Sequence, residues 1–557
     1  MSNNCTECCD ALDCRMTAAE TNITELFSRT NQIKEYLEGH FFFITTEAEL
    51  AAFLLAPVGI GIIMGPGANG EIELSQQHNV SVAGTQLYGG GLTFPYSFGA
   101  ANSCLKIMAR NVRIEHVKFD MENTCVAVGP AYLPGSWSLD IAVVISHEHD
   151  CSGLVITHCE FVNFFGAIRR DVMTIPNGAY VVGVNEVSFI DTAMPYSDNC
   201  EISHNHFHHF CGYAMFILAR MRNLSVHHNR ACGWDLADDV GALVSVSTMA
   251  YEVDGAGGNA FWIGNKSDYH KFHHNTVCQV DRHGWEHWNA QGGPDDPYGA
   301  QTDGNRDSEC TDNVFYQIQG FATSCMGAGT IKVHGNIYRE IGTSAIESVG
   351  DSVNTGFHSV KNNNIESVLS RRSIDPRNGL LGTGSSAVGI KIDGVKGGAF
   401  NDNKIGMCSS KIPLMGNDSA GIKVIGIQNA VQNIDISGNQ LLNAGDAMIV
   451  VNLDNVAIAN FKNIWIENNK LVQTEHAYRS TDAGGVAVSN MFGVYVIKVS
   501  PCFVRNNSLI VTTGLLMAAG GGGFRNNGTA VVYNGDNNNA PFTADTEIMG
   551  SNVTVII

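Results

Sequence analysis

The chain has 557 residues and a formal net charge of −21, and 44% of its residues are hydrophobic, which is ample for a large buried core. The acidic balance argues against nucleic acid as a partner, because proteins that bind phosphate backbones carry basic patches. No apolar run of about 18 residues occurs, so we expect no membrane insertion. No nucleotide fingerprint and no specific cluster of metal ligands is visible, so we expect no cofactor and no metal.

The first 15 residues are predicted to form a tail that is rich in cysteine. Four thiols lie close together, at Cys5, Cys8, Cys9 and Cys14. They could form disulfide cross-links to a partner or sister chain, hold zinc, or stay free in a disordered tail. No histidine and no second Cys-x-x-Cys pair accompanies them, which weakens the zinc alternative. The segment also lacks the charged leader and apolar core of a secretory signal peptide, so we expect no export by that route.

Residues 16–40 are predicted to form a helix. Thr17 and Glu20 have the spacing of a capping box. The positions that alternate at spacings of three and four, as in a coiled-coil seam, are Ile23, Leu26, Thr30, Ile33 and Leu37. A seam of about two and a half heptads is marginal alone, so the helix either trimerises the chain or caps the next domain. We divide the chain into an attachment and trimerisation segment, 1–40, and a repeat domain, 41–557.

A short phrase recurs from there onward: apolar, two polar residues, Asn, any residue, apolar. Its ten clear copies place Asn at Asn205, Asn229, Asn275, Asn313, Asn336, Asn363, Asn403, Asn439, Asn469 and Asn507. The shortest spacing is 23 residues, which is typical of a solenoid. Apolar residues alternate on both sides of the Asn, which indicates strands. Because Asn tolerates the left-handed backbone of a tight turn and its amide can bond to the next copy, we predict stacked parallel strands with an Asn ladder.

Dividing the region from Val117 to Asn527 by this spacing gives about 17 coils and a rod on the order of 80 Å long. The longer spacings, of 38 to 46 residues, hide either a coil without Asn or an inserted loop. Cys232 and Cys278 occupy the same slot of two copies. If those coils are neighbours, the two residues could form a disulfide or stack as free thiols.

Histidine fills the position before the Asn slot in five copies: His116, His158, His204, His228 and His274. Repetition should stack these imidazoles along one turn. They could bind a metal, form a pH-sensitive surface, or simply serve as turn residues. The repeat explains their spacing without a ligand, so we favour the last interpretation.

Two long departures from the repeat, at 230–274 and 276–312, hold aromatic residues beside acids. We expect Trp234, Trp262, Trp285 and Trp288 to bind substrate, since aromatic rings stack on the apolar faces of sugars. The candidate catalytic residues are Asp238, Asp239, His283 and Glu286. Long excursions from a rigid scaffold are where function concentrates. The alternative is that these acids decorate solvated loops or bind a structural cation.

The repeats resemble the right-handed parallel β-helix of the pectate lyase-like superfamily, over roughly residues 45–550. The resemblance implies an all-β fold, a single-stranded right-handed parallel β-helix, with a short N-terminal α-helical or coiled-coil segment. A short trimeric coiled coil that leads into a β-helix resembles the base of bacteriophage tailspikes. That likeness implies a homotrimer, attachment to phage tail or baseplate proteins through the N-terminus, and a host-surface glycan as ligand. No separate C-terminal trimerising domain is evident, unlike in many tailspikes.

The order of Asp238-Asp239, His283-Gly284 and Lys391 is similar to the paired-Asp, His-Gly and Ile-Lys signatures of polygalacturonase-like hydrolases. Gly389 replaces the Arg of those enzymes, and their Asn-Thr-Asp element is missing. The resemblance implies Asp239 as general acid, Asp238 as the residue that activates water, and His283 as an orienting group. The stretch 281–283 with Glu286 resembles the acid and histidine site of alginate epimerases and lyases.

We therefore expect a bacteriophage tailspike or tail-fibre protein, located in the virion tail and extracellular after host lysis. It would recognise a host-surface polysaccharide and, if the acids are catalytic, degrade it by hydrolysis or elimination. One alternative is a free polysaccharide hydrolase or lyase of the same superfamily. Another is a purely structural virion protein linked to its partners by disulfides, which non-reducing electrophoresis would reveal.

Overall fold

The computed structural model describes residues 40–67, 70–94, 103–121, 141–170, 195–217, 220–233, 260–264, 269–280, 283–288, 307–318, 320–327, 329–350, 356–370, 387–410, 419–426, 431–445, 447–452, 462–474, 492–497, 502–512, 532–533, 546–549 and 552–556. Here the chain forms the right-handed parallel β-helix expected from the sequence, with three strands in most coils. The predicted helix at 16–40 and the four N-terminal cysteines lie outside these residues. Within them no helix is both long and apolar enough to cross a membrane.

The first set of strands precedes the Asn turn and forms one parallel sheet of 16 strands among the described residues. Its strands, in spatial order, are β1 (Phe41–Ile44), β2 (Ile60–Ile63), β5 (Gln86–Tyr88), β8 (Arg113–Glu115), β11 (Val155–Thr157), β14 (Glu201–Ser203), β17 (Ser225–His227), β20 (Lys271–His273), β23 (Ser308–Thr311), β26 (Ile331–His334), β29 (His358–Lys361), β32 (Gly398–Asn401), β35 (Gln432–Ser437), β38 (Lys462–Glu467), β41 (Cys502–Arg505) and β44 (Thr546–Met549).

The second set follows the Asn turn. Its strands, each paired with the next, are β3 (Glu71–Glu73), β6 (Gly91–Thr93), β9 (Lys118–Asp120), β12 (Glu160–Arg170), β15 (His206–Ile217), β18 (Arg230–Cys232), β21 (Thr276–Val280), β24 (Val314–Ile318), β27 (Ile337–Arg339), β30 (Asn364–Ser370), β33 (Lys404–Ser410), β36 (Gln440–Leu442), β39 (Lys470–Gln473), β42 (Ser508–Thr512) and β45 (Asn552–Ile556).

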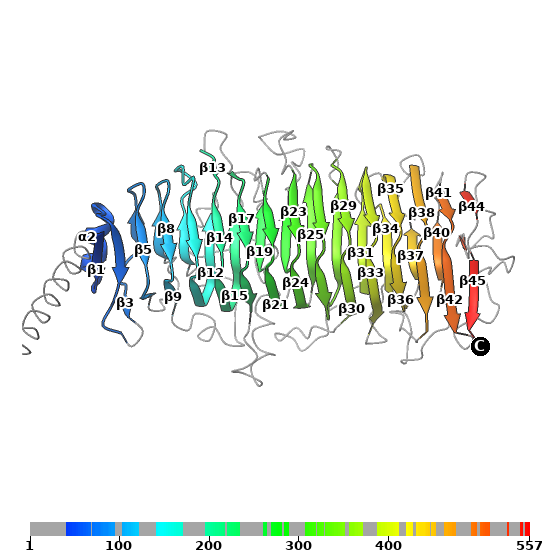
Figure 1. Ribbon diagram of the computed structural model, residues 1–557, viewed down its shortest axis with the longest axis horizontal. Helices are drawn as coiled ribbons and strands as arrows, with labels where there is room; N and C mark the ends of the chain where they lie inside the picture. Colours follow the sequence, from blue (N-terminus) through cyan, green and yellow to red (C-terminus); the bar gives the residue numbers. More distant parts are fainter. Residues whose placement is uncertain are drawn as a thin grey trace, which may run out of the picture.

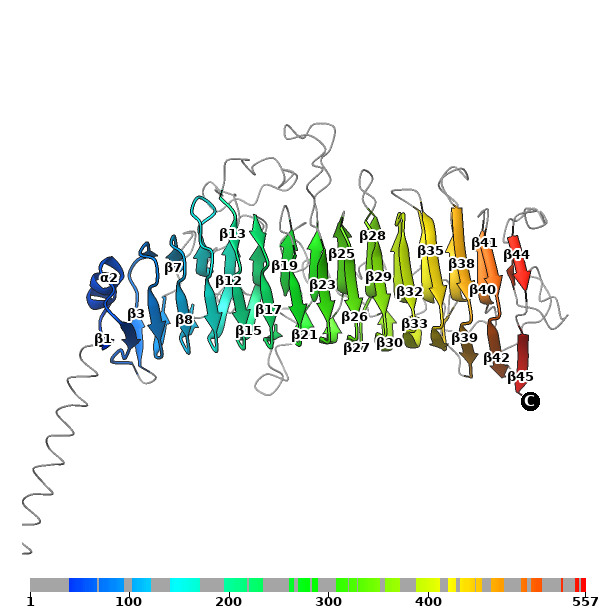
Figure 2. The same ribbon diagram turned by 45° about the horizontal axis from the view of Figure 1, so that its top comes forward.

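The third set completes each coil, and the long strands β12 and β15 join it to the second set. Its other strands are β4 (His78–Val80), β7 (Ser103–Ile107), β10 (Ile141–Ile145), β19 (Phe261–Gly264), β22 (Trp285–Trp288), β25 (Phe321–Gly327), β28 (Ser344–Gly350), β31 (Ala387–Asp393), β34 (Ser419–Ile425), β37 (Ala447–Asn452), β40 (Phe492–Ile497) and β43 (Val532–Tyr533). A separate pair, β13 (Ser197–Asp198) and β16 (Met221–Arg222), forms a two-stranded parallel sheet of its own. The stacked coils form a straight rod from β1 at its blue end to β45 at its red end (Figures 1 and 2).

The Asn ladder forms as predicted. Each Asn Oδ1 accepts the backbone N–H and the amide of the Asn one coil earlier, at 2.8–3.1 Å from Asn205 to Asn507. The amide also donates to a strand carbonyl, as from Asn313 Nδ2 to Phe272 O at 3.0 Å. All ten Asn residues are at most 3% exposed. The ladder therefore satisfies buried polar groups that the turn would otherwise leave unpaired.

The left-handed residue of the turn is the one before each Asn, so our expectation that the Asn itself adopts this conformation was wrong. All five stacked histidines have φ between +53° and +56°. Other coils place Asp312, Gly335, Asn362, Asp402, Gly438, Asn468 and Asn506 there, also at positive φ. His, Asp, Asn and Gly are the residue types that enter this region most readily. The histidine column thus follows from backbone geometry, as the turn interpretation requires.

The long spacings between Asn residues are inserted segments, not extra coils. Val226 on β17 pairs directly with Phe272 on β20, although 46 residues separate the corresponding Asn229 and Asn275. From β8 to β41 the first sheet passes through twelve strands, each bonded to the next. The estimate of about 17 coils was therefore too high, because equal division ignored these insertions.

A helix that the sequence analysis missed lies at the start of the rod. Helix α2 (Glu47–Leu55) has a capping box, in which the Thr46 side chain accepts from the Glu49 N–H and the Glu49 carboxylate accepts from the Thr46 N–H. Its Leu50 and Phe53 are buried in the core. The helix packs against β1 and β4, so residues 47–55 cover the first coil (Figure 1).

Candidate functional site

An outward row of polar and aromatic side chains follows the third set of strands. Backbone pairing aligns Phe216, Trp262, Glu286, Ser324, Glu347, Lys391 and Lys423, one from each of seven consecutive strands from β15 to β34. Strand alternation sets their direction, since Ile346 and Ser348 flank Glu347 and are buried on the inner side. The row therefore runs along the rod axis, one residue per coil.

Glu347 lies at the centre of this row with two polar partners. Lys391 Nζ is 2.7 Å from its Oε1, and Ser324 Oγ donates to its Oε2 at 3.1 Å. Glu347 and Ser324 are each only 8% exposed. Burying a charged pair costs desolvation energy and contributes little to folding. Such an arrangement instead suits a preorganised ligand site.

Two predicted site residues, His283 and Glu286, lie beside this centre. The His283 ring stacks on Phe321, with ring centroids 5.1 Å apart, and Lys391 Nζ lies 5.6 Å from the centroid of the same Phe321 ring. Glu286 pairs with Ser324 across neighbouring strands, and Ser324 bonds to Glu347. The structure thus brings His283 and Glu286 into one neighbourhood with Lys391.

Sequence reasoning missed Ser324, Phe321 and Glu347. The signal was present in the third strand of each coil, where Ile-Lys occurs at 390–391 and again at 422–423. Extending the repeat beyond the Asn turn to that strand would have aligned Glu347 with Lys391.

The structure corrects the role expected for Trp285. Its side chain is fully buried in the core, where it stacks on Phe272 at 5.7 Å and on His287 at 5.6 Å. Alternation on β22 turns Trp285 inward and Glu286 outward, so Trp285 cannot offer a ring face to a ligand. Trp262 does lie in the outward row, but it is 2% exposed, edge-on to Phe216.

The remaining predicted residues lie outside the part of the chain whose side chains the structure describes. They are Trp234, Asp238, Asp239 and the side chain of Trp288. In sequence, 234–259 leads directly into β19, which carries Trp262, and 289–306 follows β22, which carries Glu286.

A buried polar cluster lies on the inner side of the same coils. His287 Nε2 is 2.9 Å from Ser308 Oγ, and His358 contacts Ser348. Burial, with smaller effects of His270 and His358, holds the pKa of His287 well below its usual value. His287 is therefore neutral, which keeps a positive charge out of the core beneath the row.

The rings of the histidine column stack on one another along the turn before the Asn ladder. Successive rings from His116 to His274 are 4.7–5.0 Å apart and nearly parallel within the column. Within the described residues, no group of three or more His, Cys, Asp or Glu side chains could hold a metal ion. This geometry does not support the metal interpretation of the column.

Cys232 and Cys278 form a disulfide between β18 and β21, with Cα atoms 4.5 Å apart. The sequence left open a disulfide or stacked free thiols at these two positions, and the structure contains the disulfide. It joins the two neighbouring coils that contain β18 and β21.

No protein-family model matches the chain, and no curated protein sequence does either. Solved structures similar to it include the Dettilon tailspike protein, at 11% identity and TM-score 0.41, with 83% of this chain and 69% of that chain covered. A tailspike double mutant of E. coli bacteriophage HK620 with a pentasaccharide has 11% identity and TM-score 0.38, covering 94% of this chain and 81% of that chain.

An α-1,3-glucanase catalytic unit from Streptomyces thermodiastaticus has 12% identity and TM-score 0.38, covering 78% of this chain. This chain spans only 59% of the length of that glucanase. The solved structures similar to this chain thus include two phage tailspike proteins and the catalytic unit of a glucanase.

Proposed function

We propose that this protein binds a polysaccharide along the outer face of its third set of strands. The row from Trp262 to Lys423 supports the proposal, because it offers carboxylates, ammonium groups and a hydroxyl at one residue per coil. A linear glycan lying along the rod would meet a new side chain at each step of about 4.8 Å. Carboxylates and lysines bond sugar hydroxyls, and a partly buried site strengthens such bonds.

The central observation is the Lys391–Glu347–Ser324 group, in which Glu347 and Ser324 are buried. Its charged pair holds the carboxylate of Glu347 in a fixed orientation, while the row on either side supplies further contacts. In this proposal Glu347 and Glu286 bind sugar hydroxyls, and His283 is held in place by Phe321.

The proposal extends to a homotrimeric spike in a phage tail, attached through residues 1–40 and acting on host-surface polysaccharide. If the site also cleaves its ligand, Asp239 is the general acid and Asp238 activates water. Glycoside hydrolysis requires two such carboxylates on opposite sides of the scissile bond.

Incubation of the purified protein with surface polysaccharides from candidate hosts tests the catalytic part. New reducing ends that disappear in an Asp238→Asn/Asp239→Asn variant would support hydrolysis. Absorbance of unsaturated uronate would instead indicate elimination. Absence of any product from a glycan that the protein demonstrably binds would refute catalysis and leave a binding protein.

A further inference from the structure

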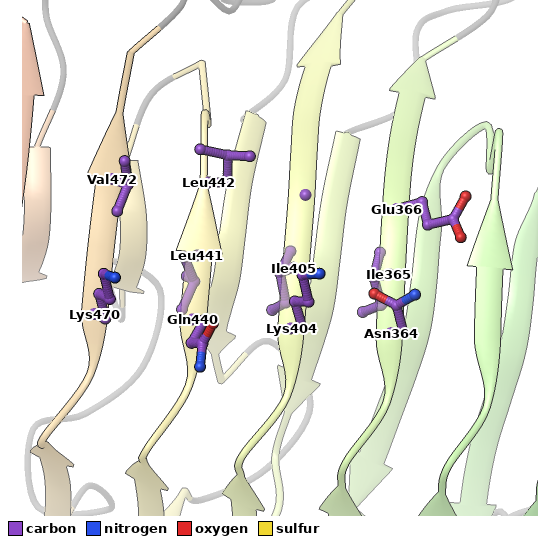
Figure 3. A pocket seen from close by; sticks show the side chains of 11 residues that line it. Asn364, Ile365, Glu366, Lys404, Ile405, Gln440, Leu441, Leu442, Lys470 and Val472 are labelled. Carbon is purple, nitrogen blue, oxygen red and sulfur yellow. The ribbon is translucent and has the colours of Figure 1, made fainter.

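A shallow basic hollow lies on a different face of the rod, across four strands of the second set. Its volume is about 450 Å³, and it crosses β30, β33, β36 and β39. Figure 3 shows Asn364, Lys404, Gln440 and Lys470 in one row, one from each strand. Backbone pairing aligns the same four residues.

The two lysines of this row differ from three others of the chain in having no carboxylate partner in the part of the chain that the structure describes. Lys118, Lys332 and Lys391 are each paired with a carboxylate. No carboxylate among the described residues pairs with Lys404 or Lys470, and both side chains are exposed. The hollow therefore presents two lysines without a carboxylate partner among the described residues, and the carboxylate that also lines it, Glu366, is paired with Arg339 at 2.8 Å.

An apolar strip runs beside the basic row. Leu442, which is 43% exposed, and Val472 are paired neighbours two residues along from Gln440 and Lys470. On β33 the corresponding position is Gly406, where a Cβ atom would lie 2.1 Å from the Glu366 carbonyl oxygen. Only glycine fits there, so the strip is open at that point and the hollow keeps its depth.

Lys404 and Lys470 are two coils apart, or about 10 Å along the rod. We propose that this hollow binds an anionic polysaccharide, with acidic sugars of an extended chain meeting the two lysines. Gln440 lies between them and can both donate to and accept from sugar hydroxyls. Leu442 and Val472 offer the apolar surface on which a sugar ring packs.

The occupant follows from charge complementarity. A neutral glycan would leave both ammonium groups without a counter-charge, whereas a polyuronate supplies one carboxylate for each. The inference rests on the proposed function for the kind of ligand, a polysaccharide, but it concerns a separate surface. Binding here would hold an acidic host glycan against the rod. The outer face of the third set of strands would bind a different segment of polysaccharide.

Affinity electrophoresis of the full chain tests this, with polygalacturonate as the anionic probe and dextran as the neutral one. The protein should be retarded by polygalacturonate, and less so when salt is raised to about 0.15 M, because exposed charges are screened. Lys404→Gln/Lys470→Gln should weaken the binding about tenfold. Lys361→Gln, a lysine on the first sheet, is the matched control and should leave binding unchanged.

Three results would overturn the inference. The first is that polygalacturonate does not retard the wild type at all. This result would leave the proposed function intact for a neutral glycan. Loss of binding in Glu347→Gln but not in the double lysine variant is another, because it places the anionic ligand on the third-set face. A change of oligomeric state in the double lysine variant, measured by sedimentation, would assign the hollow to a contact between copies of the chain.

Discussion

Lys391 Nζ lies 2.7 Å from Oε1 of Glu347, one coil away on the outward row of the third set of strands. The side chains are 23% and 11% exposed, respectively, so water screens this pair far less than a surface pair. The first sheet holds a comparison in the ion pair of Lys332 and Glu309, at 2.6 Å with side chains 44% and 33% exposed. The two pairs have similar geometry and different burial.

Removing one partner of the Lys391–Glu347 pair should therefore lower the free energy of unfolding more than removing one partner of the exposed pair. We predict that Lys391→Met lowers the free energy of unfolding by about 1–3 kcal/mol, because it leaves the Glu347 carboxylate without its counter-charge. Glu347→Gln/Lys391→Met should recover part of this loss. Lys332→Met, the control, should cost less than about 1 kcal/mol. Chemical denaturation of the wild type and the three variants measures the difference, and equal losses for the two lysine substitutions would contradict the prediction.

The Asn ladder gives a second prediction. Asn313→Ala removes the amide that bonds Phe272 O and the Oδ1 that accepts from the Asn275 N–H, and all of these groups are buried. The loss should be about 2–4 kcal/mol, because the remaining partners are left unsatisfied. The control is Asn79→Ala, an exposed position at which the side chain accepts a hydrogen bond from the Gln77 amide at 3.2 Å. Similar melting temperatures for Asn313→Ala and the control would refute the ladder's role.

Much of the fold could be predicted because each coil repeats one local pattern. The Asn slot marks a turn, and the apolar residues that flank it mark the strands, so Asn205 and Ile202 were placed correctly. Helix α2 occurs once and was missed, although Thr46 and Glu49 carry the capping signal.

The candidate site was harder to predict for a physical reason. Its residues come from separate coils, and only the pairing register shows that Glu286, Ser324 and Glu347 share one face. Trp285 was wrongly assigned to the ligand-binding surface, because the face of the sheet on which its side chain lies depends on where β22 begins. A shift of one residue in that start exchanges Trp285 with Glu286.

The stacked histidines, together with the neighbouring pair His227 and His273, whose ring centroids are 4.9 Å apart, predict a stability that depends on pH. Burial first, and then the neighbouring imidazoles, lower the pKa of His273 to about 4 and also lower those of His227 and His204. The unfolded chain thus binds these protons more readily than the folded chain does. Stability should be fully present above pH 6.5, the unfolded value, and should fall as the pH drops from there toward 4.

Thermal melting across this range checks the prediction. His227→Gln/His273→Gln should flatten the pH dependence, since it removes two imidazoles whose pKa is lowered, together with their Nδ1–Nδ1 contacts of 3.0 Å to His228 and His274. The control is His116→Asn, at the end of the stack, where Asn suits the left-handed turn and most of the dependence should persist. An unchanged slope in the double variant would exclude these histidines as the cause.

The disulfide between Cys232 and Cys278 closes a loop with a sequence separation of 46 residues. Cys232→Ser/Cys278→Ser should lower the free energy of unfolding by about 2–4 kcal/mol, mainly because the unfolded chain gains freedom. Reductant should destabilise the wild type but not this variant, which serves as its control. Alkylation of both thiols in the denatured, unreduced protein would show that the bond is absent.

The central claim is that the outward row of the third set binds polysaccharide. Its most direct test is the equilibrium binding of host-surface polysaccharide fragments to the wild type, to Glu286→Gln/Glu347→Gln and to the control Glu309→Gln. The account predicts about a tenfold or greater loss of affinity in the double variant, from the loss of charge-assisted hydrogen bonds, and no change in the control. Wild-type affinity in a folded double variant would contradict the claim.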